Sequence, residues 1–212
     1  MIEIVPFTLG PVMTNAYLVA DPQSRAAVVI DPAADGEVIV AEAERRGWRI
    51  GSIWLTHAHF DHLAGAGQVA DLVDPPPPVA LHPDDYPLWR LQGGASLFGM
   101  RIDPGPEPTI DLYDRQVLHL GDNQAQVFHT PGHTRGHVIF YFSDQGVVFC
   151  GDVIFQGSIG RTDLPGGDYE TLLHSIQAKI LPLPEKTRLL SGHGPETTVG
   201  VEKQSNPFIL YG

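Results

Sequence analysis

Residues 57–62, which read HAHFDH, place three of the chain's ten histidines and an aspartate within six positions. This loop directly follows the apolar run at residues 53–55, which has the composition of a buried β-strand. Alternation would direct the first two histidines to one side, and the turn after them can aim Asp61 and His62 at a neighbouring point. Imidazole and carboxylate groups suit zinc, and also iron or manganese. The loop therefore indicates a fold in which a strand end opens onto a metal site.

Three further residues of ligand type occur in similar surroundings. They are His133 in TPGH, Asp152 in CGD and His193 in SGH. Each lies just past a strand-like run and beside a glycine, which allows the backbone to approach closely. In α/β folds, sites form beyond strand ends in this way. A purely structural zinc site closes with four ligands, and this candidate set exceeds that need.

Short runs rich in Val and Ile alternate with turn signals along the whole chain, and they predict more strands than helices. We expect strands at residues 2–5, 16–19, 26–30, 49–56, 79–82, 117–120, 125–130, 138–142, 147–150 and near 189–190. We expect helices at residues 38–46, 63–73, 169–180 and near 198–204, a rigid proline connector at 75–78, and a long loop at 89–108. This order predicts an α/β fold in which two packed sheets carry helices on their outer faces, as a single domain over residues 1–212.

The net charge, the N-terminal sequence and the lengths of the apolar runs disfavour several classes of partner. The formal net charge is -12, and the 13 Lys and Arg residues are spread along the chain, which disfavours nucleic acid. The N-terminus lacks a signal-peptide pattern, and no apolar run is long enough to span a bilayer. The lone Cys150 permits no internal disulfide, and its apolar neighbours predict a buried, inert thiol. We therefore expect a soluble cytoplasmic protein without nucleic-acid or membrane partners; the oligomeric state stays open.

HAHFDH, TPGHTRGH, GD and SGH, in this order, resemble the signature of the metallo-β-lactamase superfamily from Asp31 to His193. The segment GSIGRTD at residues 157–163 is most similar to the glyoxalase II-like branch, the hydroxyacylglutathione hydrolases. The resemblance implies a four-layer αβ/βα sandwich of two mixed sheets flanked by helices. It also implies a metal-dependent hydrolase that cleaves the thioester of a small S-acyl thiol conjugate.

The resemblance further implies a dinuclear centre of divalent ions, zinc and/or iron, or manganese. It assigns His57, His59 and His133 to the first metal, Asp61, His62 and His193 to the second, and Asp152 to both. A hydroxide between the two ions would be the nucleophile, because two cations lower the pKa of the water that they share. Asp61 would also orient that hydroxide, which makes Asp61 and Asp152 the candidate catalytic carboxylates.

Two residues are expected to support the ligands without binding metal. Asp31, in VIDP, resembles a superfamily aspartate and could fix the tautomer of a ligand histidine, although a simple turn aspartate is the alternative. His137, the second histidine of TPGHTRGH, is expected to be structural or supporting. The remaining histidines lack a ligand-like context and are interpreted as ordinary core or surface residues: His82, His119, His129 and His174.

For substrate recognition, the sequence offers one candidate residue, Arg161. Full-length glyoxalase II enzymes carry a helical C-terminal extension that supplies cations for glutathione. Here the sequence after His193 leaves room for only one short helix, which puts glutathione recognition in doubt. Arg161 lies in a glycine-rich loop and could grip a substrate carboxylate. The alternative is an ion pair with Asp163 that holds the loop.

Other activities are compatible with the same residues. A persulfide dioxygenase would use a single iron bound by His57, His133 and Asp152, and that family also carries a GRTD segment. β-Lactamase activity is less favoured because those enzymes are typically secreted. Ribonuclease or phosphodiesterase activity is less favoured because a basic surface is missing. A non-enzymatic metal-binding module is a further alternative.

Overall fold

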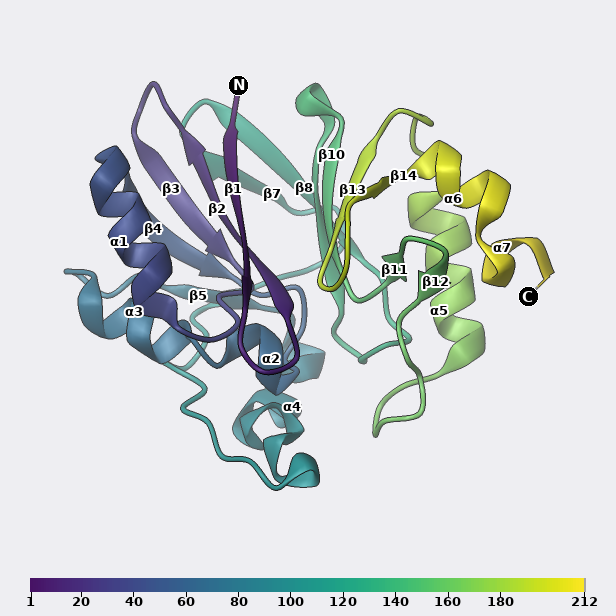
Figure 1. The fold of residues 1–212 in the computed structure, drawn as a ribbon, viewed down its shortest axis with the longest axis horizontal. Coiled ribbons are helices and arrows are strands. Elements are labelled where there is room, and N and C mark those ends of the chain that lie inside the picture. Colours follow the sequence, from purple (N-terminus) through teal and green to yellow (C-terminus); the bar gives the residue numbers. More distant parts are fainter. Residues whose placement is uncertain (212) are drawn as a thin grey trace.

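Two six-stranded sheets form the centre of the computed structural model, which describes residues 1–211 (Figure 1). The first sheet has the order β1(Glu3–Leu9), β2(Thr14–Asp21), β3(Ala26–Ile30), β4(Arg49–Trp54), β5(Val79–Leu81), β6(Ile110–Asp111). The second has the order β14(Thr197–Thr198), β13(Arg188–Ser191), β10(Val147–Gly151), β9(Val138–Phe142), β8(Asn123–His129), β7(Val117–Leu120). Both sheets are mixed, because β3–β6 pair in parallel while β1–β3 are antiparallel, and β13 pairs in parallel with β10 but antiparallel with β14.

The inner faces of the two sheets pack against each other. Trp54 of the first sheet lies against Phe140 of the second, with ring centroids 5.3 Å apart, and Tyr17 lies against Phe149 at 5.1 Å. Every residue of β2 is buried, because the strand has apolar contacts on both faces. Its odd-numbered residues face the other sheet, and its even-numbered residues face the outer helices.

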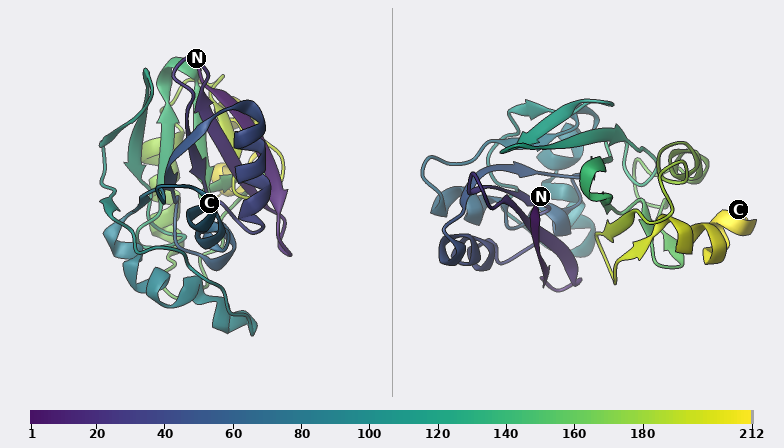
Figure 2. Two further views of the ribbon diagram at one scale, coloured as in Figure 1. Left: turned by 90° about the vertical axis from the view of Figure 1, so that its left-hand side faces the viewer. Right: turned by 90° about the horizontal axis from the view of Figure 1, so that it is seen from above.

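Helices cover the outer face of each sheet (Figure 2). The first sheet is covered by α1(Gly36–Arg46) and α3(Ala66–Leu72), and the second by α5(Tyr169–Ser175), α6(Val199–Ser205) and α7(Pro207–Tyr211). The result is the four-layer α/β sandwich that the sequence predicts. Within residues 1–211, we find no helix with the length and apolar composition needed to cross a bilayer.

Some local expectations are wrong. The predicted loop at 89–108 begins with the end of α4(Tyr86–Arg90) and the 3₁₀ turns of η2(Gln92–Phe98). The helix expected at 63–73 is divided into α2(Phe60–Leu63) and α3 at Gly65, where a Cβ atom would lie 2.7 Å from the carbonyl oxygen of Pro32. The C-terminal segment holds a second short helix, α7, where we expect only one.

Candidate metal centre

The candidate ligands lie on four segments that each follow a strand, and two of them, Asp61 and His62, lie in the short helix α2. HAHFDH follows β4, His133 follows β8, Asp152 follows β10 and His193 follows β13. The last three strands run in the same direction, because β8 and β10 are both antiparallel to β9 and β13 is parallel to β10. Their carboxyl ends therefore meet at one edge of the second sheet, opposite the end of β4 in the first.

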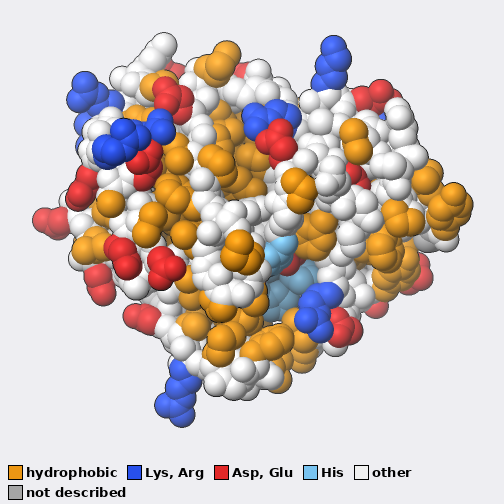
Figure 3. Space-filling model, viewed as in Figure 1, with side chains coloured by type: hydrophobic (Ala, Val, Ile, Leu, Met, Phe, Trp, Pro, Cys, Tyr) orange, Lys and Arg blue, Asp and Glu red, His pale blue; other side chains and the backbone are white. Residues whose placement is uncertain are grey.

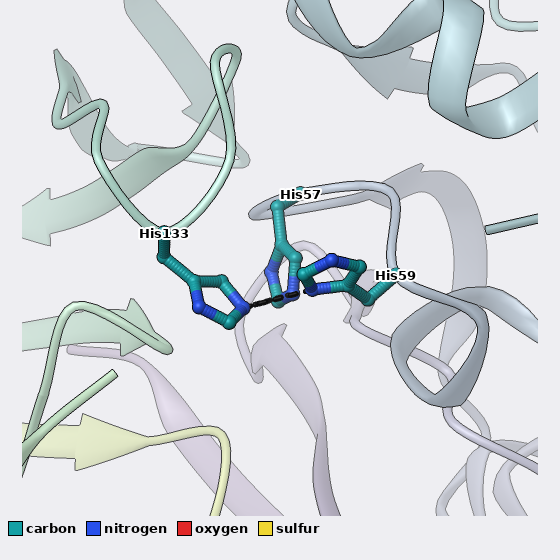
Figure 4. A group of neighbouring side chains, drawn as sticks. All are labelled: His57, His59 and His133. Carbon is teal, nitrogen blue, oxygen red and sulfur yellow. Dashed lines mark hydrogen bonds between the residues drawn. The ribbon is translucent and has the colours of Figure 1, made fainter. Parts of the chain in front are cut away.

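His57, His59 and His133 form the first group of converging side chains (Figure 4). Nδ1 of His59 lies 2.8 Å from Nε2 of His133, which in turn lies 3.2 Å from Nε2 of His57. All three rings are buried. Three imidazole nitrogens from two loops thus face one small volume.

The contacts of the far ring nitrogens determine which nitrogens carry a proton. Nδ1 of His133 donates to the carbonyl oxygen of Arg161 at 2.7 Å, which leaves Nε2 unprotonated in the neutral ring. The Thr56 hydroxyl donates to Asp31 at 2.6 Å, so its oxygen accepts from Nδ1 of His57 at 3.0 Å. Burial lowers the pKa of each ring in the first group, and that of His59 falls to about 3. These rings are therefore neutral, and the unprotonated Nε2 atoms of His57 and His133 face the space that the three rings share.

Asp61, His62 and His193 form the second group. Oδ2 of Asp61 lies 3.2 Å from Nε2 of His193 and 3.6 Å from Nε2 of His62. Thr14 donates its hydroxyl proton to the same Asp61 oxygen at 2.8 Å, which fixes the carboxylate. Nδ1 of His62 donates to Oδ2 of Asp31 at 2.9 Å, so Nε2 is the atom that faces the group.

Asp152 lies between the two groups. Its Oδ1 is 3.3 Å from Nε2 of His62, and its Oδ2 is 3.5 Å from Nε2 of His133 and 3.6 Å from Nε2 of His193. The carboxylate is almost fully buried. One oxygen therefore faces the second group, and the other lies between ligand atoms of both groups.

Two unsatisfied atoms test whether this site fits metal ions. Nε2 of His62 and Oδ1 of Asp152 are buried, and neither has a hydrogen-bond partner within residues 1–211. Leaving a polar atom buried and unsatisfied costs about 1–3 kcal/mol, and more for a charged group. A divalent cation at this point would satisfy both atoms, and the set of nitrogen and oxygen donors suits zinc or iron. The residues around these two atoms therefore fit a divalent metal ion.

The second group is more anionic than the first. Burial alone would lower the pKa of His62, but the carboxylates of Asp152, Asp61 and Asp31 outweigh it and raise that pKa well above its ordinary value. Burial alone would raise the pKa of Asp152, but His62, His133 and His193 hold it well below its usual range. The ionised carboxylates therefore favour the binding of a cation in this group.

Asp31 and His137 occupy the places that a supporting role requires. Asp31 accepts hydrogen bonds from the Thr56 backbone N–H, the Thr56 hydroxyl and Nδ1 of His62. Nε2 of His137 accepts from the backbone N–H of Asp152 at 3.1 Å, and Nδ1 contacts the Thr130 hydroxyl at 3.0 Å. Both nitrogens of His137 are therefore used within the protein, and neither is free for a metal.

The side chain of Arg161 is paired with Asp163, which is the loop-holding contact that the sequence left as an alternative. Its guanidinium makes two hydrogen bonds of 2.8 Å to Asp163, and both side chains are exposed. Arg161 still lines a pocket of about 210 Å³ beside the candidate ligands, together with Val12, Phe60, Phe98, Met100 and Leu164. Histidine side chains are visible in a hollow bordered by hydrophobic side chains (Figure 3). The wall of this pocket is thus mainly apolar, and the charge of its cation is already paired.

Two other histidines lie close together, but their rings are not oriented to bind one metal ion. Ligand atoms of His82, Asp84 and His129 lie within 4.8 Å of one another. The two rings, however, are stacked with centroids 4.2 Å apart and planes within 5° of parallel. Lone pairs lie in the ring planes, so stacked rings direct them side by side rather than at a common point. The interpretation of these histidines as ordinary residues stands.

Two further residues, Thr56 and Thr14, support the candidate ligands and were not predicted from the sequence. Thr56 directly precedes His57, and its position between a strand end and a ligand could have signalled its role. Thr14 is distant in sequence from Asp61, and the pairing of Thr14 with His193 in an isolated β-bridge helps to bring it to the site. Cys150 is buried as expected, and burial raises the pKa of its thiol to about 12.

Comparison with known proteins identifies related chains. Residues 9–193 match the family described as the metallo-beta-lactamase superfamily. Hydroxyacylglutathione hydrolase GloC of Haemophilus influenzae is 38% identical over 216 residues, which cover 98% of this chain and 97% of that protein. The crystal structure of the BLEG-1 B3 metallo-beta-lactamase is 42% identical, with a TM-score of 0.90 and 99% of each chain covered. That of TTHA1623 in a di-iron-bound form is 41% identical, with a TM-score of 0.87, and covers 96% of this chain and 99% of that one.

Proposed function

The chain belongs to the metallo-β-lactamase superfamily, and we propose that it is a dinuclear hydrolase that cleaves the thioester bond of S-acyl thiol conjugates. The observation that carries this proposal is the position of Asp152 between two groups of three ligand-type residues, with unsatisfied atoms where a cation would lie. The similarity to GloC, whose name gives a thioester substrate, supports the choice of bond.

Each group of side chains has a defined part in this proposal. His57, His59 and His133 would hold one ion, and Asp61, His62 and His193 the other, with Asp152 in contact with both. Bound ions would lower the pKa of a water at the site and polarise the carbonyl of the substrate. In the overall reaction, water forms the new C–O bond, the C–S bond breaks, and the thiol leaves with a proton. Asp61, whose carboxylate accepts a hydrogen bond from Thr14, would orient the attacking water.

The apolar wall of the pocket favours a substrate whose reacting end is uncharged. Phe98 packs on Phe60 at a centroid distance of 5.3 Å, and together with Leu164 and Val12 these rings would exclude bulk water from the acyl group. The pairing of Arg161 with Asp163 weakens the case for a carboxylate anchored there. Recognition of the thiol carrier would then depend on shape and apolar contact.

A second candidate is β-lactam hydrolysis, which the similarity to BLEG-1 favours. Hydrolysis of a lactam and of a thioester both proceed by attack of water on a polarised carbonyl, so the same side chains would serve either reaction. The persulfide dioxygenase alternative needs one iron, and under it Asp61, His62 and His193 would have no metal to bind.

Parallel assays on the purified, metal-loaded protein separate these activities. The substrates would be S-lactoylglutathione, a chromogenic cephalosporin and glutathione persulfide, the last followed by oxygen uptake. We expect thioester hydrolysis that a chelator abolishes and added metal restores. Oxygen uptake with the persulfide, without thioester hydrolysis, would contradict the proposal, as would efficient hydrolysis of the cephalosporin alone.

A further inference from the structure

Asp85 is a buried carboxylate outside the ligand set. It ends the single turn η1(Pro83–Asp85), which follows β5, and the residue is 1% exposed. Oδ2 accepts hydrogen bonds from the backbone N–H of Ala58 at 3.0 Å and from the Thr134 hydroxyl at 2.8 Å. Oδ1 accepts from the backbone N–H of Gly136 at 2.7 Å. Burial of a charged group is costly, and these hydrogen bonds compensate for it.

The donors to Asp85 come from the two loops that supply the first group of histidines. Ala58 lies between His57 and His59, and Thr134 directly follows His133. The loops belong to different sheets, since one follows β4 and the other follows β8. The Asp85 carboxylate therefore links both loops within one residue of all three nitrogens that converge there.

Gly136 permits this link. A Cβ atom at Gly136 would lie 2.7 Å from the backbone nitrogen of Asp85 and 2.9 Å from its Cβ, which is closer than a side chain tolerates. A glycine at this position lets the loop after His133 approach the turn that carries Asp85. The absence of a side chain at Gly136 therefore allows the backbone N–H of Gly136 to reach the Asp85 carboxylate.

We propose that Asp85 is a positioning residue that holds the two loops at the spacing required by a metal bound to His57, His59 and His133. This role of Asp85 depends on the proposed function in one respect only, which is that those three histidines form a metal site. Asp85 does not reach the metal itself, because its oxygens are committed to Ala58, Thr134 and Gly136. The second group should be insensitive to it.

The test compares cobalt affinity at each group, measured by titration with a competing chelator. His193→Ala weakens metal binding at the second group, so the cobalt affinity measured in that background is that of the first group. His59→Ala weakens metal binding at the first group, so the affinity measured there is that of the second group. Asp85→Asn replaces an acceptor oxygen with a donor NH₂, so the three donors can no longer all be satisfied. We expect it to lower cobalt affinity about 10- to 100-fold in the His193→Ala background and to leave it unchanged in the His59→Ala background.

Glu202 provides a matched control. It is also fully buried, and it accepts hydrogen bonds from the Gly157 backbone N–H, the Thr197 hydroxyl and the Asn206 side-chain amide. None of these donors lies on a ligand loop. Glu202→Gln should destabilise the fold through the same kind of loss while retaining cobalt affinity at both groups.

Thr134→Val keeps the proposal testable if Asp85→Asn does not fold. It removes one of the three donors and should give a smaller loss that is again confined to the first group. Wild-type first-group affinity in folded Asp85→Asn, or in Thr134→Val when Asp85→Asn is unfolded, would overturn the proposal. Equal losses at both groups would also overturn it. A wild-type protein that binds two metals but does not cleave thioesters would defeat the proposed function and leave this inference standing.

Discussion

Nε2 of His62 lies 3.3 Å from Oδ1 of Asp152, and neither buried atom has a hydrogen-bond partner within residues 1–211. The other nitrogen of His62 is fixed by Asp31, and the backbone N–H of Asp152 is fixed by His137. The protein thus holds two ligand-type atoms in place without satisfying either of them. That combination is expected where a cation completes the site.

Asp152→Ala should be more damaging than the loss of a single terminal ligand. A carboxylate between two cations neutralises both, and its removal leaves like charges close together. We expect Asp152→Ala to lose both metals and nearly all activity, whereas His193→Ala retains the first metal. Metal content and hydrolysis rates of the two purified variants check this. Retention of both metals by Asp152→Ala would exclude the shared position.

Acidification should release the metal of the second group before that of the first. Against the effect of burial, the surrounding carboxylates raise the pKa of His62 well above its ordinary value, so protons compete for its Nε2 even near neutral pH. Burial lowers the pKa of His59 to about 3 and that of His57 well below its ordinary value, so those nitrogens stay unprotonated. As the pH falls, the second group becomes protonated and the first does not.

This order can be followed by cobalt absorption during a titration from neutral to mildly acidic pH, with His59→Ala and His193→Ala as single-group references. We expect the loss of the second ion while the spectrum of the first persists. Release of both ions in a single step, or of the first ion alone, would show that the carboxylates do not control the order.

Arg161→Ala and Asp163→Ala should have similar effects. Their side chains pair with each other in an exposed loop, where such pairs contribute little to stability. We expect each variant to lower kcat/KM by less than about tenfold, through a looser loop beside His133. Kinetics and melting curves of both variants measure this. A loss of tenfold or more in Arg161→Ala, with Asp163→Ala unaffected, would show instead that the guanidinium grips the substrate.

Phe98→Ala tests the apolar wall of the pocket. Its ring packs on Phe60 and lines the space beside the ligands, so its loss should weaken binding of an apolar acyl group without affecting the metals. A lost aromatic contact corresponds to roughly a five- to tenfold rise in KM, with kcat nearly unchanged. An unchanged KM for a series of acyl thiols of increasing chain length would exclude Phe98 from the binding surface.

The sequence was sufficient to predict the four-layer fold and to select the residues that converge. Strand composition located most strands, and ligand-type residues after strand ends pointed to one edge of the fold. The contacts of Thr14 and Asp85 were not predictable, because their partners lie 27 or more positions away and are brought near by the packing of separate elements.

The loop predicted at 89–108 is correct for residues 99–108 and wrong for the part before them, for a local reason. Its glycines suggested an irregular loop, but Gly93 and Gly94 adopt positive φ angles of 63° and 75° within a chain of 3₁₀ turns. The pairing of Arg161 with Asp163 was one of two alternatives that the sequence left open, because both require the same residues. Only side-chain geometry decides between them.

Metal content per chain tests the central claim most directly. The purified wild-type protein should bind two transition-metal ions, zinc or iron or both, by elemental analysis and titration. Asp152→Ala should reduce that number, and the Asp163→Ala variant should not. A single iron per chain, with no second site filled on titration, would contradict the shared Asp152 site and the dinuclear account.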